Sequence, residues 1–120
     1  MQITKNFQRF EFRCRCKDRG LDTDDSWCHG QAWPHRELVE KLQQLRDHFG
    51  APVTINSGCR CPRYNAHVGG VPLSEHIRGT AADIVVRGVE PADVARVARD
   101  LGFFVIEYET FTHVDVRYEI

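Results

Sequence analysis

The sequence SEHIRGTAADI, residues 74–84, places a histidine and an aspartate seven positions apart, with small residues between them. The apolar and β-branched residues that follow predict a strand over TAADIVV, residues 80–86. Asp83 then lies on this strand and His76 lies in the loop before it, where Gly79 and Ala81 would let the backbone approach closely. A loop that merely enters a strand needs no such combination, which indicates a functional site.

Regular elements are predicted on both sides of this stretch. A helix is expected from Pro34 to Gly50, because its apolar residues recur at intervals of 4, 3 and 4. A second helix over residues 91–101 carries a similar stripe. Strands are predicted at residues 52–56, 103–108 and 111–118, the last two as a hairpin. The sequence therefore predicts an α+β fold, a small and mostly antiparallel sheet packed by two main helices.

The other segments have weaker patterns. Residues 1–33 are predicted to be irregular, with a short extended piece where Phe10 and Phe12 alternate with other residues. Residues 57–72 are rich in turn formers and are expected to form a loop with one helical turn from Arg63 to Val68.

Length and composition restrict the class of protein. The 120 residues fit one domain over 1–120, and the net charge of −1 argues against a nucleic-acid binder. No apolar run is long enough to span a membrane, and the N-terminus shows no apolar signal-peptide region. We therefore expect a monomer without nucleic-acid or membrane partners that is cytoplasmic as synthesised.

Five cysteines are present, and their role is open at this point. Reduced thiols are the default for a chain without an export signal. A structural zinc site is an alternative, formed by Cys14, Cys16, Cys28 and His29, although Cys-x-Cys spacing suits a tetrahedral site less well than Cys-x-x-Cys. A disulfide is the third possibility.

The C-terminal strand offers a third metal ligand beside His76 and Asp83. A catalytic zinc ion takes three protein ligands and keeps one position open. Alternation along THVDVR, residues 112–117, puts His113 and Asp115 on one face and the valines on the other. Taken alone, however, a histidine in a strand is more often a packed or surface residue, and Asp83 is equally typical of a strand edge.

Longer motifs connect these residues. The stretch INSGCRCPRYNAHVGGVPLSEHIRGTAADI, residues 55–84, followed by THVDVR, closely resembles the zinc D-Ala-D-Ala carboxypeptidase family. Its relatives include D-Ala-D-Ala dipeptidases, phage endolysin peptidases and the hedgehog signalling domain, so the resemblance implies their zinc fold. Three ordered motifs carry it: Ser74, His76, Gly79, Ala81 and Asp83; Ser57, Gly58 and Arg60; and His113, Val114 and Asp115.

The resemblance implies roles for these residues. One zinc ion would be bound by His76, Asp83 and His113. Arg60 would hold a substrate carboxylate or the developing oxyanion, because its planar fork matches two oxygens. Further substrate-binding or supporting residues are expected among Ser57, Ser74 and Asn65.

The general base is less clear from the sequence. Many relatives carry an acid three residues before the third ligand, where this chain has Thr110. A hedgehog-like relative has a glutamate six positions before the histidine, which matches Glu107. We rank Glu107 first, then Asp115, then Glu109, noting that a turn at residues 109–110 would break the strand alternation behind this ranking.

Two function classes follow from the resemblance. The first is a zinc metallopeptidase that hydrolyses peptidoglycan stem peptides, as a D-Ala-D-Ala carboxypeptidase or a murein endopeptidase. The lack of a visible signal peptide fits a phage or prophage product released to the cell wall, and it equally fits a recycling enzyme. The second class is a non-catalytic zinc-stabilised binding module that uses the same pocket.

Overall fold

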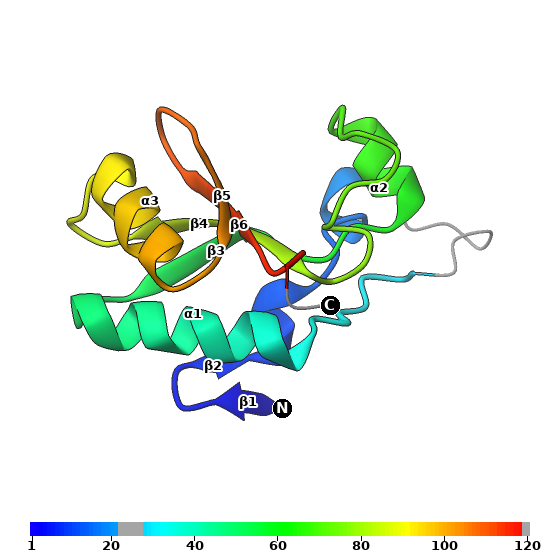
Figure 1. The fold of residues 1–120 in the computed structure, drawn as a ribbon. Coiled ribbons are helices and arrows are strands. Elements are labelled where there is room, and N and C mark those ends of the chain that lie inside the picture. Colours follow the sequence, from blue (N-terminus) through cyan, green and yellow to red (C-terminus); the bar gives the residue numbers. More distant parts are fainter. Residues whose placement is uncertain (22–27, 119–120) are drawn as a thin grey trace.

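The computed structural model describes residues 1–21 and 28–118 and has the expected α+β architecture. Its main sheet has four antiparallel strands in the order β3-β4-β6-β5 (Figure 1). The strands are β3 (Val53–Ser57), β4 (Ala81–Val86), β5 (Phe104–Glu107) and β6 (Thr112–Asp115). The last two form the predicted hairpin.

The two faces of this sheet have different chemistry. On β4, Ala82, Ile84 and Val86 are buried in the main core, and Val114 of β6 lies beside them. Asp83 of β4 and His113 of β6 point to the opposite face, because side chains alternate along a strand. One face therefore builds the core, and the other is available for a site.

Helices α1 (Arg36–Phe49) and α3 (Pro91–Asp100) cover the core face (Figure 1). Leu38, Leu42 and Leu45 of α1 are fully buried, as their spacing predicts. The helix ends at Gly50, which adopts φ 60° and donates its N–H to the carbonyl of Arg46. None of the helices in the described part of the chain is both long and apolar enough to cross a membrane.

The N-terminal segment is more regular than expected. Strands β1 (Gln2–Thr4) and β2 (Phe7–Gln8) form a small hairpin that precedes the 3₁₀ helices η1 (Arg9–Phe12) and η2 (Lys17–Arg19). The predicted extended piece at Phe10 and Phe12 is wrong. The Glu11 carboxylate accepts the backbone N–H of Gln8, which caps a helical turn instead. Residues 22–27, within the segment expected to be irregular, lie outside the described residues.

The connection between β3 and β4 contains the short helix α2 (Pro62–His67), close to the predicted helical turn. The final part of this connection lies against Trp33. The Trp33 indole N–H donates to the Ile77 carbonyl, and the Gly79 carbonyl accepts the N–H of His35. Gly79 has φ 77°, and a Cβ there would overlap the Trp33 carbonyl oxygen. The glycine between His76 and Asp83 is therefore required by both backbone angle and space.

Gly79→Ala should destabilise the protein more than Gly88→Ala. Gly88 has φ 74° and open space around it, so alanine there meets only the left-handed strain of about 1–2 kcal/mol. Alanine at position 79 adds the overlap with Trp33, and such overpacking costs about 1–3 kcal/mol. Urea unfolding of both variants measures the difference. Equal losses of unfolding free energy in the two variants would show that Trp33 moves away from the added methyl group without cost.

Candidate metal centre

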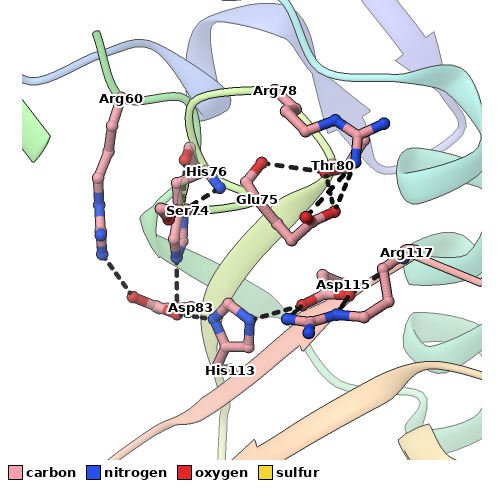
Figure 2. A network of polar contacts seen from close by, with 11 residues as sticks. Arg60, Ser74, Glu75, His76, Arg78, Thr80, Asp83, His113, Asp115 and Arg117 are labelled. Carbon is pink, nitrogen blue, oxygen red and sulfur yellow. Dashed lines mark hydrogen bonds and ion pairs between the residues drawn. The ribbon is translucent and has the colours of Figure 1, made fainter. Parts of the chain in front are cut away.

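Three predicted ligands converge on the face of the sheet opposite the core. Asp83 and His113 are directly paired across β4 and β6, and His76 reaches them from the preceding loop. Asp83 Oδ1 lies 2.9 Å from His113 Nδ1 and 3.2 Å from His76 Nε2. One ligand atom from each residue lies within 4.8 Å of the others (Figure 2). All three side chains are buried.

The other nitrogen of each imidazole is already occupied. His76 Nδ1 lies 2.7 Å from the Gly58 carbonyl oxygen, so this nitrogen carries a proton and Nε2 faces the centre. His113 Nε2 lies 2.9 Å from Asp115 Oδ2, which leaves Nδ1 toward the centre. Carbonyl and carboxylate partners of this kind fix metal-ligating histidines. Two nitrogens and one carboxylate oxygen beside a cavity are a donor set that fits zinc with an open position.

Electrostatics favour a cation at this point. Burial opposes the charge of Asp83, but hydrogen bonds with His113 and His76 outweigh it and hold its pKa well below the ordinary value. Burial also opposes a charge on His113, yet its hydrogen bonds to Asp115 and Asp83 raise its pKa. The carboxylates thus stay ionised and attract positive charge.

Asp115, ranked second as general base, lies between His113 and Arg117. It is completely buried, and its carboxylate contacts His113 Nε2 and the guanidinium of Arg117, at 2.9 Å from Nε and 2.8 Å from Nη2. Burial opposes its charge, but these hydrogen bonds lower the pKa of Asp115 to about 2. A carboxylate held on both sides, and not among the residues that line the cavity, is placed to orient His113 rather than to reach a substrate.

The structure does not bring Glu107, the first-ranked base, toward the ligands. The β5–β6 register pairs Ile106 with His113 and Glu107 with Thr112. Thr112 faces α3, donating its hydroxyl to the Pro91 carbonyl, so Glu107 is exposed on the helix side of the sheet. The turn between the strands resets the alternation that had placed Glu107 beside His113. Glu109 lies in that turn.

Arg60 points at the metal centre and is held on all three guanidinium nitrogens. Nε donates to Ser57 Oγ at 3.1 Å, Nη1 to Asn65 Oδ1 at 3.2 Å and Nη2 to Asp83 Oδ2 at 3.2 Å. A bulge after Ile55 brings Ser57 opposite Asp83. Asn65 is buried and also donates to the Val71 carbonyl. Ser57 and Asn65 therefore position Arg60, which favours the supporting role among the two expected for them.

Ser74 and Glu75 flank His76 in the loop. The Ser74 hydroxyl accepts the backbone N–H of His76 at 3.1 Å, and Ser74 also lines the cavity. The Glu75 carboxylate accepts the Thr80 hydroxyl at 3.0 Å and lies near Arg78, so it turns away from the ligands (Figure 2). Both residues hold the loop in the conformation that presents His76.

The ligands lie at the floor of a cavity of about 450 Å³. Two cationic groups, Arg60 and Arg117, line it beside the ligands. Its remaining walls include six apolar or aromatic side chains from the loop and the hairpin: Val68, Val71, Leu73, Ile106, Tyr108 and Phe111. A peptide with apolar side chains and a carboxylate matches this combination.

Three contributors were missed by sequence reasoning. The Gly58 carbonyl sets the tautomer of His76, and Arg117 supports Asp115 while stacking 3.6 Å above the Phe104 ring. Gly70 is required because a Cβ there would overlap the Asn65 amide oxygen. The alternation that selected His113 and Asp115 also reaches Arg117, so that residue had a usable signal. The carbonyl of Gly58 and the space requirement at Gly70 have no such signal in the sequence.

Comparisons with known proteins bear on this centre. A family model described as Peptidase M15 matches residues 5–115, which include all three candidate ligands. A zinc D-Ala-D-Ala carboxypeptidase from Streptomyces albus G is 39% identical over 64 residues. This alignment covers 52% of the chain but only 25% of the carboxypeptidase, so the chain matches a quarter of that relative's length.

Asp115→Asn should weaken zinc binding by about 10- to 100-fold, the usual effect of removing a ligand's supporting carboxylate. The amide cannot balance the charge of Arg117 and supports His113 less strongly. Competition with a chromophoric chelator measures the affinity of this site. Asp93→Asn on the exposed side of α3 is the matched control and should leave it unchanged. An unchanged affinity in Asp115→Asn would contradict the orienting role.

Proposed function

The chain belongs to the peptidase M15 family, and on this premise we propose that it is a zinc-dependent peptidase that hydrolyses peptidoglycan stem peptides. The observation that carries the proposal is the convergence of His76, Asp83 and His113 on the floor of an open cavity. The relative from Streptomyces albus G is named for D-Ala-D-Ala, the end of such a stem peptide, which supports this substrate class.

The residues around the centre suit hydrolysis of a peptide bond. Zinc bound there would supply a Lewis acid that polarises a carbonyl and makes a water molecule more acidic. Gly58 and Asp115 keep the two imidazoles oriented before substrate arrives. Preorganised ligands of this kind avoid a reorganisation cost during the reaction.

Arg60 and Arg117 are the groups expected to bind a substrate carboxylate or a developing oxyanion. A guanidinium has five N–H donors, and the contacts of Arg60 with Ser57, Asn65 and Asp83 use three. Its remaining donors belong to the two terminal nitrogens beside the cavity. Because Arg60 is already immobilised, binding substrate costs little additional side-chain entropy.

Hydrolysis also requires a proton acceptor, and we propose Glu109 by elimination, since it lies in the β5–β6 turn although it is not among the residues that line the cavity. The turn that carries it is closed by the Tyr108 N–H, which donates to the Phe111 carbonyl at 3.0 Å, and both aromatic residues line the cavity. Glu107 faces the helices, and the carboxylates of Asp115 and Glu75 are committed elsewhere. Glu109 is the remaining acid among those considered from the sequence.

One observation favours the alternative, a zinc-stabilised binding module. Within the described ranges, the acidic residues that line the cavity are Glu75 and Asp83, and both are engaged in contacts. A pocket without a mobile carboxylate would still recognise a peptide. Activity therefore has to be tested separately from zinc binding.

The zinc-loaded protein should release D-Ala from an acylated D-Ala-D-Ala tripeptide or cleave purified muropeptides. A chelator should abolish the reaction, and zinc should restore it. His113→Ala should be inactive, whereas His67→Ala, an exposed histidine of α2, should retain wild-type turnover. Chromatography of the products identifies the bond cut. Zinc binding without cleavage of any muropeptide would favour the binding module.

Glu109→Gln should reduce kcat roughly 10²- to 10⁴-fold while retaining zinc, as expected for loss of a general base. Glu107→Gln is the matched control on the same hairpin and should leave kcat near the wild-type value. Glu75→Gln provides a third comparison within the loop. A large loss in Glu75→Gln with zinc retained, and none in Glu109→Gln, would move the proton acceptor to Glu75.

A further inference from the structure

Four of the five cysteines come together away from the candidate metal centre. Cys14 and Cys16 follow η1, and Cys28 is the first described residue after position 21. Cys61 immediately precedes α2. Their sulfur atoms all lie within 4.8 Å of one another, and each residue is at most 1% exposed. None of the five cysteines, all of which the structure describes, is in a disulfide.

This arrangement has the chemistry of a closed tetrahedral site. Zn–S bonds of about 2.3 Å place the sulfurs of a tetrahedral site about 3.8 Å apart, which the cluster can accommodate with small side-chain movements. Backbone N–H groups already point at sulfur: Cys61 donates to Cys14 Sγ at 3.3 Å, and Tyr64 donates to Cys61 Sγ at 3.4 Å. Such contacts stabilise the negative charge that thiolates carry when they bind a metal.

We propose that Cys14, Cys16, Cys28 and Cys61 bind a second zinc ion whose role is structural. Four buried protein ligands leave no position for water or substrate, which distinguishes this site from the open centre at His76. The alternative zinc site considered from the sequence had His29 as its fourth ligand. It is exposed, and Cys61, far along the chain, replaces it.

The surroundings explain why this part of the chain would use a metal. Among the residues that the structure describes, the cluster is a separate small core that also includes buried Tyr64, with Leu21 and Trp33 packed against it. The segments it joins contain short helices but no strand of the main sheet (Figure 1). A region with so little apolar burial gains stability from a metal cross-link, since binding energy becomes folding energy.

The charge of the loaded site would be negative. A zinc ion with four thiolates has a net charge of −2 by simple addition. The cysteines are flanked in sequence by basic residues, namely Arg13, Arg15, Lys17, Arg19 and Arg63. Part of this basic run is already paired, since Arg13 and Arg15 lie 3.7 and 3.6 Å from the Asp18 carboxylate.

The fifth cysteine provides an internal control. Cys59 is also buried, but it belongs to the main core, where its sulfur accepts the Trp33 backbone N–H at 3.1 Å. Cys59 and Cys61 thus share burial and chemistry but differ in whether three other sulfurs are nearby. Burial alone predicts that they respond alike to substitution, whereas a metal site predicts that only Cys61 matters for zinc content.

The experiment begins with the zinc content of the wild-type protein, purified under reducing conditions and measured by elemental analysis. We expect two zinc ions per chain. An organomercurial that reacts with thiols should release one, recorded with a zinc indicator, and the other should remain with the histidine site. In the double variant His76→Ala and His113→Ala, X-ray absorption should show a sulfur shell at about 2.3 Å.

Variants separate the two sites. Cys61→Ser should lower the zinc content from two to one, whereas Cys59→Ser should keep two. If Cys61→Ser does not fold, the wild-type release experiment still decides the question. The proposal is overturned if the wild-type protein holds one zinc ion that the organomercurial does not release, or if mass spectrometry finds disulfides among the four cysteines. Neither result bears on peptidase activity, which depends on His76, Asp83 and His113.

Discussion

The buried carboxylate of Asp83 is the group on which the site depends. A carboxylate removed from water must be compensated by positive charge or hydrogen bonds, and here both oxygens are used. Oδ1 faces His76 and His113, while Oδ2 accepts the guanidinium of Arg60. These three partners come from a loop, a neighbouring strand and the segment after β3, so the fold must bring separate parts of the chain to one point. Zinc would add the charge that the imidazoles only partly provide.

Much of this could be read from the sequence because the relevant signals are local or periodic. The helices follow apolar stripes, and alternation on one short strand correctly puts His113 and Asp115 on a common face. The same rule failed for Glu107, because it was counted through a turn, and a turn resets which face each residue occupies. Ser57 gives a related case. A bulge adds one residue before it, and this changes the side of the sheet on which the following side chain lies.

Other features depend on contacts that sequence spacing does not encode. Gly58 acts through its carbonyl oxygen, and its lack of a side chain allows the close approach of the Phe12 backbone. Cys61 joins a cluster whose other members lie more than thirty positions earlier, whereas His29, next to Cys28, points to solvent. Nearness in sequence suggested His29 as a fourth donor, whereas the folded path of the loop brings the Cys61 sulfur close to the other three.

The two centres share one short segment of chain, which couples stability to chemistry. Arg60 extends toward Asp83, while the adjacent Cys61 turns into the sulfur cluster. The backbone of Arg60 is also tied to the His76 carbonyl, and that of Cys59 to the Phe12 carbonyl. A guanidinium that must hold a defined position needs a rigid backbone beneath it, and a loop alone rarely provides one. Zinc bound by the four thiolates would restrain this loop at Cys61, while the guanidinium of Arg60 is held by its own hydrogen bonds with Ser57, Asn65 and Asp83.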